Sequence, residues 1–191
     1  MVVRVKNEWQ AEWIIFSGNG VIMSRKIIGV FGAGNVTESD GEYELALKVG
    51  GQLAREGFAV LTGGLGGVMA AASKGAKEAG GMTVGILPGT CRTSPANRYV
   101  DIAIYTGMGE ARNVINVKSC LAAIAIGGEY GTLSEIGLAL KGGCPIILLN
   151  SWTLTHHSGL RHEVPVAETA EQAVRMAVQA AGKNDSPTSF I

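Results

Sequence analysis

An excess of charge of either sign is missing from this sequence: 16 Lys and Arg residues balance 16 Asp and Glu residues, and no basic run occurs. An extended nucleic-acid interface therefore has no electrostatic support. Also missing is an apolar stretch long enough to cross a bilayer, and charged residues interrupt the N-terminal segment 1–16, unlike a signal peptide. We therefore expect neither an extended nucleic acid nor a membrane as a partner, and we expect a cytoplasmic protein.

Patterns typical of metal and redox sites are absent as well. The three cysteines fit no CxxC or CxxH spacing, which predicts reduced thiols and no metal site: Cys91, Cys120 and Cys144. The three histidines fall in a segment that we expect to be a loop: His156, His157 and His162. We expect their side chains to be solvated rather than to act in catalysis or to bind a metal.

Several familiar nucleotide and hydrolase motifs are missing too. No glycine cluster is followed by Lys-Ser or Lys-Thr, which excludes a P-loop, and no Ser-His-Asp arrangement is visible. Thr37 stands where the third glycine of a dinucleotide fingerprint belongs, and no acidic residue follows the strand that ends near Thr62. A dinucleotide-dependent dehydrogenase is therefore disfavoured.

Glycine, in contrast, is abundant, with 28 residues that mostly end apolar runs. These runs predict strands at 26–32, 58–64, 82–89, 101–107, 120–128 and 144–150. Helical periodicity between them predicts helices at 39–57 (with a Ser39–Glu42 capping box), 66–79, 109–119, 131–142 and 170–181. This alternation indicates an α/β, three-layer Rossmann-like fold, with a mostly parallel sheet of about six to seven strands and helices on both faces.

The ends of the chain do not join this alternation. We expect residues 1–22 to be an N-terminal extension, either disordered or not native, with Met23 as a candidate natural start. Residues 23–182 are expected to form a single nucleotide-binding domain, and residues 183–191 a C-terminal tail.

Three expected strands end in glycine clusters that lead into helices, at 31–39, 62–70 and 126–135. Glycine lets the backbone approach a ligand closely, and the N-terminus of the following helix attracts a phosphate. Because the carboxyl ends of parallel strands share one edge, the three turns together predict a site for a phosphate-bearing, nucleotide-like ligand there. The candidate binding residues are Gly32, Gly34, Gly63, Gly64, Gly66, Gly67, Met69, Gly127, Gly128, Gly131 and Thr132.

Charged and amide side chains accompany these turns. Arg112 and Asn116 lie one turn apart on an expected helix and share a face, and a guanidinium there can clamp a phosphate. Glu135 permits two interpretations: a residue of the site, or the partner of Thr132 in a helix-capping box. In the loop 88–100, Asn97 and Arg98 are candidate ligand contacts, with a solvated loop as the alternative.

Three segments together resemble one known group: TGMGEAR (106–112), TGGLGGVMAAASKGAKEAGG (62–81) and GGEYGTLSE (127–135). Over residues 26–182 the sequence is similar to the Rossmann-like SLOG superfamily, which contains the LONELY GUY phosphoribohydrolases, long mislabelled lysine decarboxylases, and the molybdenum cofactor carrier proteins. The resemblance implies catalytic positions at Arg112 and Glu135, phosphate-binding positions at Gly128, Gly131 and Thr132, and a homodimer or higher homo-oligomer.

The sequence departs from the phosphoribohydrolase pattern at positions that face the expected ligand. Gly127 and Glu129 replace its proline and second glycine, and Asn113 replaces its lysine, so that Glu129 and Asn113 become candidate ligand contacts. These departures are closer to bacterial proteins that resemble the molybdenum cofactor carriers.

Two functions follow from the resemblance. The first is hydrolysis of the N-glycosidic bond of a nucleoside 5′-monophosphate, and the alternative is a non-catalytic carrier of molybdopterin or a nucleotide sensor; neither implies a required cofactor. An interaction module that has lost its site is a third possibility. Lysine decarboxylation is excluded, since no pyridoxal-binding lysine with its partners is evident.

Overall fold

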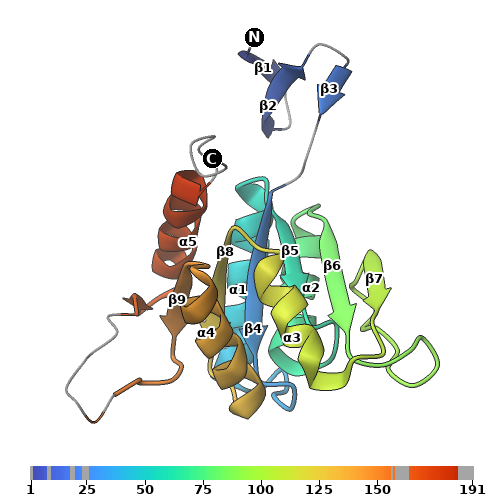
Figure 1. Cartoon of the computed structure of the whole chain (residues 1–191), viewed down its shortest axis with the longest axis vertical. Coiled ribbons are helices and arrows are strands. Elements are labelled where there is room, and N and C mark those ends of the chain that lie inside the picture. The colour runs from blue at the N-terminus through green and yellow to red at the C-terminus, as the bar shows by residue number, and fades with distance from the viewer. Residues whose placement is uncertain are drawn as a thin grey trace.

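One parallel sheet organises the molecule (Figure 1). The computed structural model describes residues 2–7, 10–17, 20–22, 26–155, 157 and 164–184. The strand order is β10-β9-β8-β4-β5-β6-β7, and all neighbouring pairs are parallel. The strands are β4 (Ile27–Gly32), β5 (Ala59–Thr62), β6 (Thr83–Leu87), β7 (Ile102–Tyr105), β8 (Ala122–Ile126), β9 (Ile146–Leu149) and β10 (Val166–Ala167).

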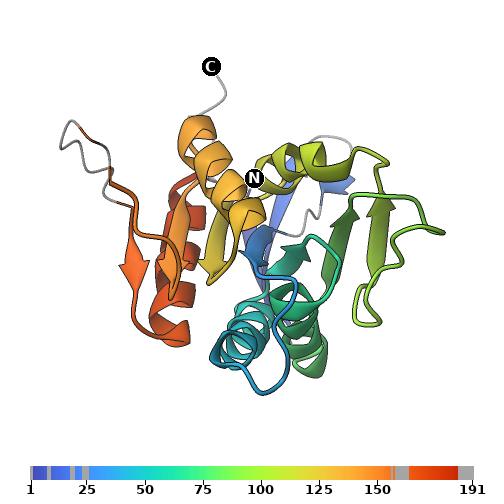
Figure 2. The same cartoon turned by 90° about the horizontal axis from the view of Figure 1, so that it is seen from below.

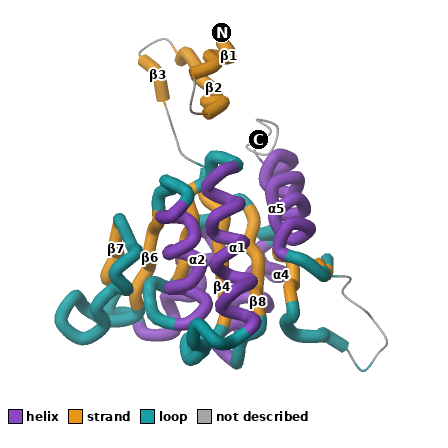
Figure 3. The backbone as a smooth tube through the Cα atoms, turned by 180° about the vertical axis from the view of Figure 1, so that it is seen from behind, coloured by secondary structure: helices purple, strands orange, loops and turns teal. Residues whose placement is uncertain are grey.

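Helices cover both faces of this sheet, which Figure 2 shows between two helix layers. One face carries α1 (Gly41–Arg55), α2 (Gly67–Glu78) and α5 (Ala170–Asn184) (Figure 3). The other carries the 3₁₀ helix η1 (Gly109–Arg112), α3 (Asn113–Lys118) and α4 (Tyr130–Gly142). The predicted three-layer α/β fold is therefore confirmed, and no helix in the described ranges is long and apolar enough to span a membrane.

Alternate side chains of the central strands fill two separate cores. On β8, Ala122, Ile124 and Ile126 pack toward α1, α2 and α5, whereas Ala123 and Ala125 pack toward α3 and α4. Every residue of β8 is buried, as expected for a strand covered on both faces.

Small residues bring α1 and α2 into close contact. A Cβ atom added to Gly50 would lie 2.0 Å from the carbonyl oxygen of Ala72, and one added to Gly75 would lie 2.0 Å from that of Leu47. The two helices therefore pack backbone against backbone, which positions the N-terminus of α2 at the carboxyl edge of the sheet.

The strand order places a switch in chain direction beside β4. From β4 the chain proceeds through β5 and β6 to β7, and it then returns to β8 on the opposite side of β4. The turns after β4 and β8 consequently diverge at the carboxyl edge and leave the crevice where open α/β sheets bind ligands.

Several local predictions were wrong. Helix α1 begins at Gly41 with Asp40 as its N-cap and no side-chain cap, because the Asp40 carboxylate accepts hydrogen bonds from Thr37 instead. Residues 109–112 form a 3₁₀ turn rather than the first turn of an α-helix, and the short edge strand β10 was not predicted.

Residues before the parallel sheet form a second, unpredicted sheet. Its antiparallel strands are β1 (Val2–Asn7), β2 (Gln10–Ser17) and β3 (Gly20–Ile22). The candidate start Met23 and residues 185–191 lie outside the described residues, and α5 extends into the expected tail as far as Asn184.

Candidate functional site

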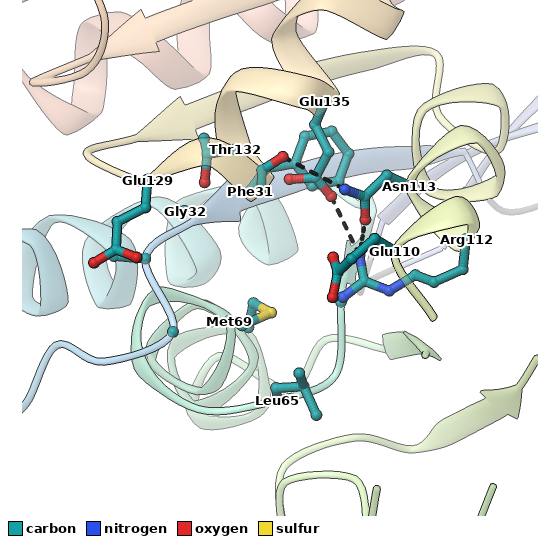
Figure 4. A pocket seen from close by; sticks show the side chains of 14 residues that line it. Phe31, Gly32, Leu65, Met69, Glu110, Arg112, Asn113, Glu129, Thr132 and Glu135 are labelled. Carbon is teal, nitrogen blue, oxygen red and sulfur yellow. Dashed lines mark hydrogen bonds and ion pairs between the residues drawn. The ribbon is translucent and has the colours of Figure 1, made fainter. Parts of the chain in front are cut away.

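A cavity of about 180 Å³ lies at the carboxyl edge of the sheet, where the turns after β4, β5 and β8 meet η1 (Figure 4). Most of the predicted site residues line it: Gly32, Gly34, Gly63, Met69, Arg112, Asn113, Glu129, Gly131, Thr132 and Glu135. The remaining lining residues are Phe31, Ala33, Leu65 and Glu110. The structure thus brings together segments that are about a hundred residues apart in the chain.

Predicted glycines that do not line the cavity shape its walls. Gly67 has φ +60°, and a Cβ atom there would lie 2.2 Å from the carbonyl oxygen of Ala33. Gly128 has φ +99°, and its Cβ would lie 2.4 Å from the side chain of Thr132. Both positions therefore require glycine. Two other glycines outside the lining, Gly64 and Gly127, also have positive φ (+75° and +54°), whereas Gly66 has φ −80°.

Asn97, a predicted ligand contact, does not line this cavity. Its side-chain amide donates hydrogen bonds to the carbonyl oxygens of Gly64 (3.2 Å) and Leu65 (2.9 Å), and its backbone N–H also donates to Gly64. It thereby fixes the turn between β5 and α2 from outside the cavity.

Arg112 lies at the centre of the site and is only 5% exposed. Its Nη1 atom is 3.5 Å from Oε1 of Glu135 and donates a hydrogen bond to Oδ1 of Asn113. A Cβ atom on Gly63 would lie 2.6 Å from Nη2, so that glycine makes room for the guanidinium. The Nε atom of Arg112 is buried and has no hydrogen-bond partner among the described residues. The guanidinium therefore keeps one donor that is closed off from solvent and makes no hydrogen bond among the described residues.

Glu135 belongs to the cavity and does not cap a helix. Helix α4 begins at Tyr130 with Glu129 as its N-cap, so the interpretation of Thr132 and Glu135 as a capping box is wrong. The side-chain amide of Asn116 donates a 2.8 Å hydrogen bond to Oε1 of Glu135, the same oxygen that faces Arg112. The expectation that Arg112 and Asn116 share a face is confirmed.

Burial dominates the ionisation of Glu135. Desolvation raises the pKa of this carboxyl to about 7, against the hydrogen bond from Asn116 and the charge of Arg112, which both lower it. The carboxylate of Glu110 adds to the rise of the pKa. A carboxyl of this kind changes its charge near neutral pH.

Polar contacts join η1 and α3 to α4. The side-chain amide of Asn113 donates a 2.8 Å hydrogen bond to Oγ of Ser134, whose hydroxyl donates to the carbonyl oxygen of Gly131 at 2.7 Å. Because Asn113 also accepts from Arg112, these bonds hold the guanidinium in register with the start of α4.

Glu129 is the departure from the hydrolase pattern, and it lines the cavity at the N-terminus of α4. Its side chain makes no capping hydrogen bond; Oε1 instead accepts a 3.1 Å hydrogen bond from the amide of Asn35, in the turn after β4. In Figure 4, Glu129 stands apart from Arg112 and Glu110, with Met69 between them in the view.

Sequence reasoning did not select Phe31, Leu65 or Glu110 as site residues. Leu65 lies inside the glycine turn 63–67, and Glu110 shares a turn with Arg112, so proximity in the chain was a usable signal for both. Phe31 is the first residue of the glycine segment 31–39, so its place in the chain was a usable signal too, although its residue type is that of any buried strand residue.

The three cysteines and His157 do not line the cavity. Cys120 and Cys144 are free thiols that pack against the core on the α3 and α4 side. Across the described residues no group of three or more His, Cys, Asp or Glu side chains is arranged to hold a metal ion. His157 is exposed, and His156 and His162 lie outside the described residues.

The similarity to known proteins covers the segment that forms the parallel sheet and the cavity. Residues 25–182 match the model of the SLOG cluster4 family. An uncharacterized protein of Archaeoglobus fulgidus is 44% identical over 156 residues, which cover 82% of this chain and 97% of the relative.

Two solved structures are similar over nearly their whole length. The molybdenum cofactor binding protein of the phototrophic bacterium Rippkaea orientalis is 40% identical with a TM-score of 0.72, and the match covers 83% of this chain and 98% of that one. The molybdenum cofactor carrier protein of Chlamydomonas reinhardtii is 37% identical, also with a TM-score of 0.72, and the match covers 83% and 99%.

Proposed function

The chain belongs to the SLOG cluster4 family, and from this premise we propose that its cavity binds a phosphorylated pterin of the molybdenum cofactor type and carries it without turnover. The observation that carries the proposal is the similarity, at 37–40% identity and over nearly the whole of each structure, to a molybdenum cofactor binding protein and a molybdenum cofactor carrier protein. The comparisons favour this function over the hydrolysis that the sequence motifs put first.

The residues of the cavity fit the two ends of such a ligand. A phosphate suits the guanidinium of Arg112, which lines the cavity, and the nearby N-terminus of α2, which no side chain caps and no acidic residue accompanies in its first turn. A pterin ring carries N–H donors and two apolar faces; Glu110 and Glu129 supply acceptors, and Leu65 and Met69 supply apolar contact. The metal of the cofactor is cargo in this proposal.

Fluorescence titration with a pterin that carries a phosphate monoester on its C6 side chain tests the proposal. Arg112→Ala should weaken binding of this ligand about 10- to 100-fold, because a charge-assisted phosphate contact is lost. The same pterin without phosphate should bind wild type and variant alike. Arg175→Ala, at an exposed position on α5, is the matched control and should change neither affinity.

N-glycosidic hydrolysis is the second candidate function, because Arg112 and Glu135 converge in the cavity at 3.5 Å. A carboxyl with a pKa of about 7 is also suited to proton transfer near neutral pH. Incubation with nucleoside 5′-monophosphates separates the two functions. Release of free base by the wild type, abolished in Glu135→Gln, would replace the carrier with a hydrolase; recovery of intact nucleotide supports the carrier.

A further inference from the structure

The carboxylates that line the cavity differ in how many of their acceptor sites are in use. Glu135 is buried, and its Oε1 atom already faces both Asn116 and Arg112. Glu129 is exposed and forms no ion pair with any lysine or arginine of the described chain. Among the described residues its side chain accepts one hydrogen bond, from the amide of Asn35 to Oε1. Most of the acceptor capacity of Glu129 is therefore available to a ligand.

The position of Glu129 also disfavours a phosphate at the start of α4. A helix N-terminus attracts an anion, but a carboxylate at the N-cap supplies that negative charge itself and repels a second one. The N-terminus of α2 has glycine at its N-cap and lies against Ala33 and Gly34, and Gly63, in the turn that leads into α2, faces the guanidinium of Arg112. The two sides of the cavity therefore favour different groups. A phosphate is favoured beside Arg112 and Gly67, and a hydrogen-bond donor is favoured beside Glu129.

We infer that Glu129 determines specificity, by accepting two hydrogen bonds from the 2-amino group and the adjacent ring N–H of a 2-amino-4-oxopyrimidine ring while the phosphate of the same ligand lies across the cavity beside Arg112. This inference rests on the proposed function and deepens it, since it names the part of the ligand that is read. Pterins and guanine share this pair of neighbouring donors. Adenine does not, because an acceptor nitrogen stands next to its amino group.

Comparing GMP with AMP isolates this contact, because both nucleotides carry the same ribose phosphate. The wild type should bind GMP about tenfold or more tightly than AMP, which is the discrimination expected of a two-point contact with a carboxylate. Glu129→Gln should lose most of this preference, because an amide offers one acceptor and one donor. Glu44→Gln, which changes an exposed carboxylate on α1 that does not line the cavity, is the matched control and should keep the ratio of the two affinities.

A phosphorylated pterin in the same titration shows whether the ring that Glu129 binds is that of a pterin or that of a guanine nucleotide. Tighter binding of the pterin than of GMP identifies a pterin as the ligand; tighter binding of GMP identifies a guanine nucleotide, which leaves the role of Glu129 standing and overturns the pterin proposal.

Failure of the inference and failure of the proposed function give different results. If the wild type binds the phosphorylated pterin but Glu129→Gln keeps the preference for GMP over AMP, or if the wild type has no such preference, the role of Glu129 is refuted and the carrier function stands. If the wild type binds none of the three ligands, both are refuted.

Discussion

Replacing Glu135 with glutamine should remove a large pH dependence of folding stability. The carboxyl is 6% exposed, and burial raises its pKa from 4.5 to about 7. A difference of this size between the folded and unfolded states corresponds to about 3 kcal/mol. Glutamine keeps the acceptor oxygen for Asn116 but cannot ionise, so the variant should lack this contribution.

The direction of the change in stability with pH follows from which state, folded or unfolded, holds the proton of Glu135 more tightly. Below about pH 4.5 both states of the wild type are protonated at Glu135, and its ionisation does not lower the free energy of unfolding. As the pH rises toward 7, the unfolded chain loses the proton while the folded protein retains it, so the folded state becomes progressively less stable. Above about pH 7 the loss is complete and the stability curve levels off.

Urea unfolding of both proteins between about pH 5 and pH 8 measures this effect. The free energy of unfolding of the wild type, minus that of Glu135→Gln, should fall by about 2–3 kcal/mol across this range, because part of the effect is already present at pH 5. Histidines and other groups are common to both proteins and cancel in the difference. Glu44→Gln is the control: Glu44 is exposed, its ion pair with Lys48 lowers its pKa, and the profile above pH 5 should match the wild type. Parallel profiles of the wild type and Glu135→Gln would refute the reasoning.

Further predictions concern packing, the glycine turn and proton uptake. Gly50→Ala should destabilise the protein by about 1–3 kcal/mol in urea unfolding, because its Cβ would overlap the Ala72 carbonyl. Gly137→Ala, in open space on α4, should stabilise the protein by about 0.5 kcal/mol. Equal effects of the two substitutions would contradict the close contact between α1 and α2. Asn97→Ala should weaken binding of the phosphorylated pterin about threefold to tenfold, because the carbonyls of Gly64 and Leu65 lose their hydrogen bonds. Unchanged affinity would show that the turn between β5 and α2 keeps its conformation without Asn97. Binding of a phosphate should raise the pKa of Glu135 further, so calorimetry in buffers of different ionisation enthalpy should show net proton uptake near pH 7, and proton release would contradict this.

Much of the fold could be predicted because its signals are local. Continuous apolar runs such as 120–128 identify strands buried on both faces, and the glycines that end them mark the edge where a ligand binds. The spacing of Arg112 and Asn116 correctly places both side chains on one face, where they meet the same oxygen of Glu135.

The rest depends on contacts that no local pattern encodes. The partner of Glu129 is Asn35, 94 positions away in the chain, and Gly63 is required by the guanidinium of Arg112 rather than by its own turn. Helix α4 begins within one residue of the predicted 131–142, but Thr132 and Glu135 only imitate a capping box, because their side chains line the cavity. The two-residue strand β10 is too short for a periodicity signal.

Native mass spectrometry of the protein, purified without oxygen from cells that synthesise molybdopterin, tests the central claim most directly. We expect one phosphorylated pterin per chain to be retained, with its mass unchanged after release; Arg112→Ala should lose it and Arg175→Ala should keep it. Wild-type protein that retains no pterin, or that retains ribose phosphate left by a cleaved nucleotide, would contradict the account.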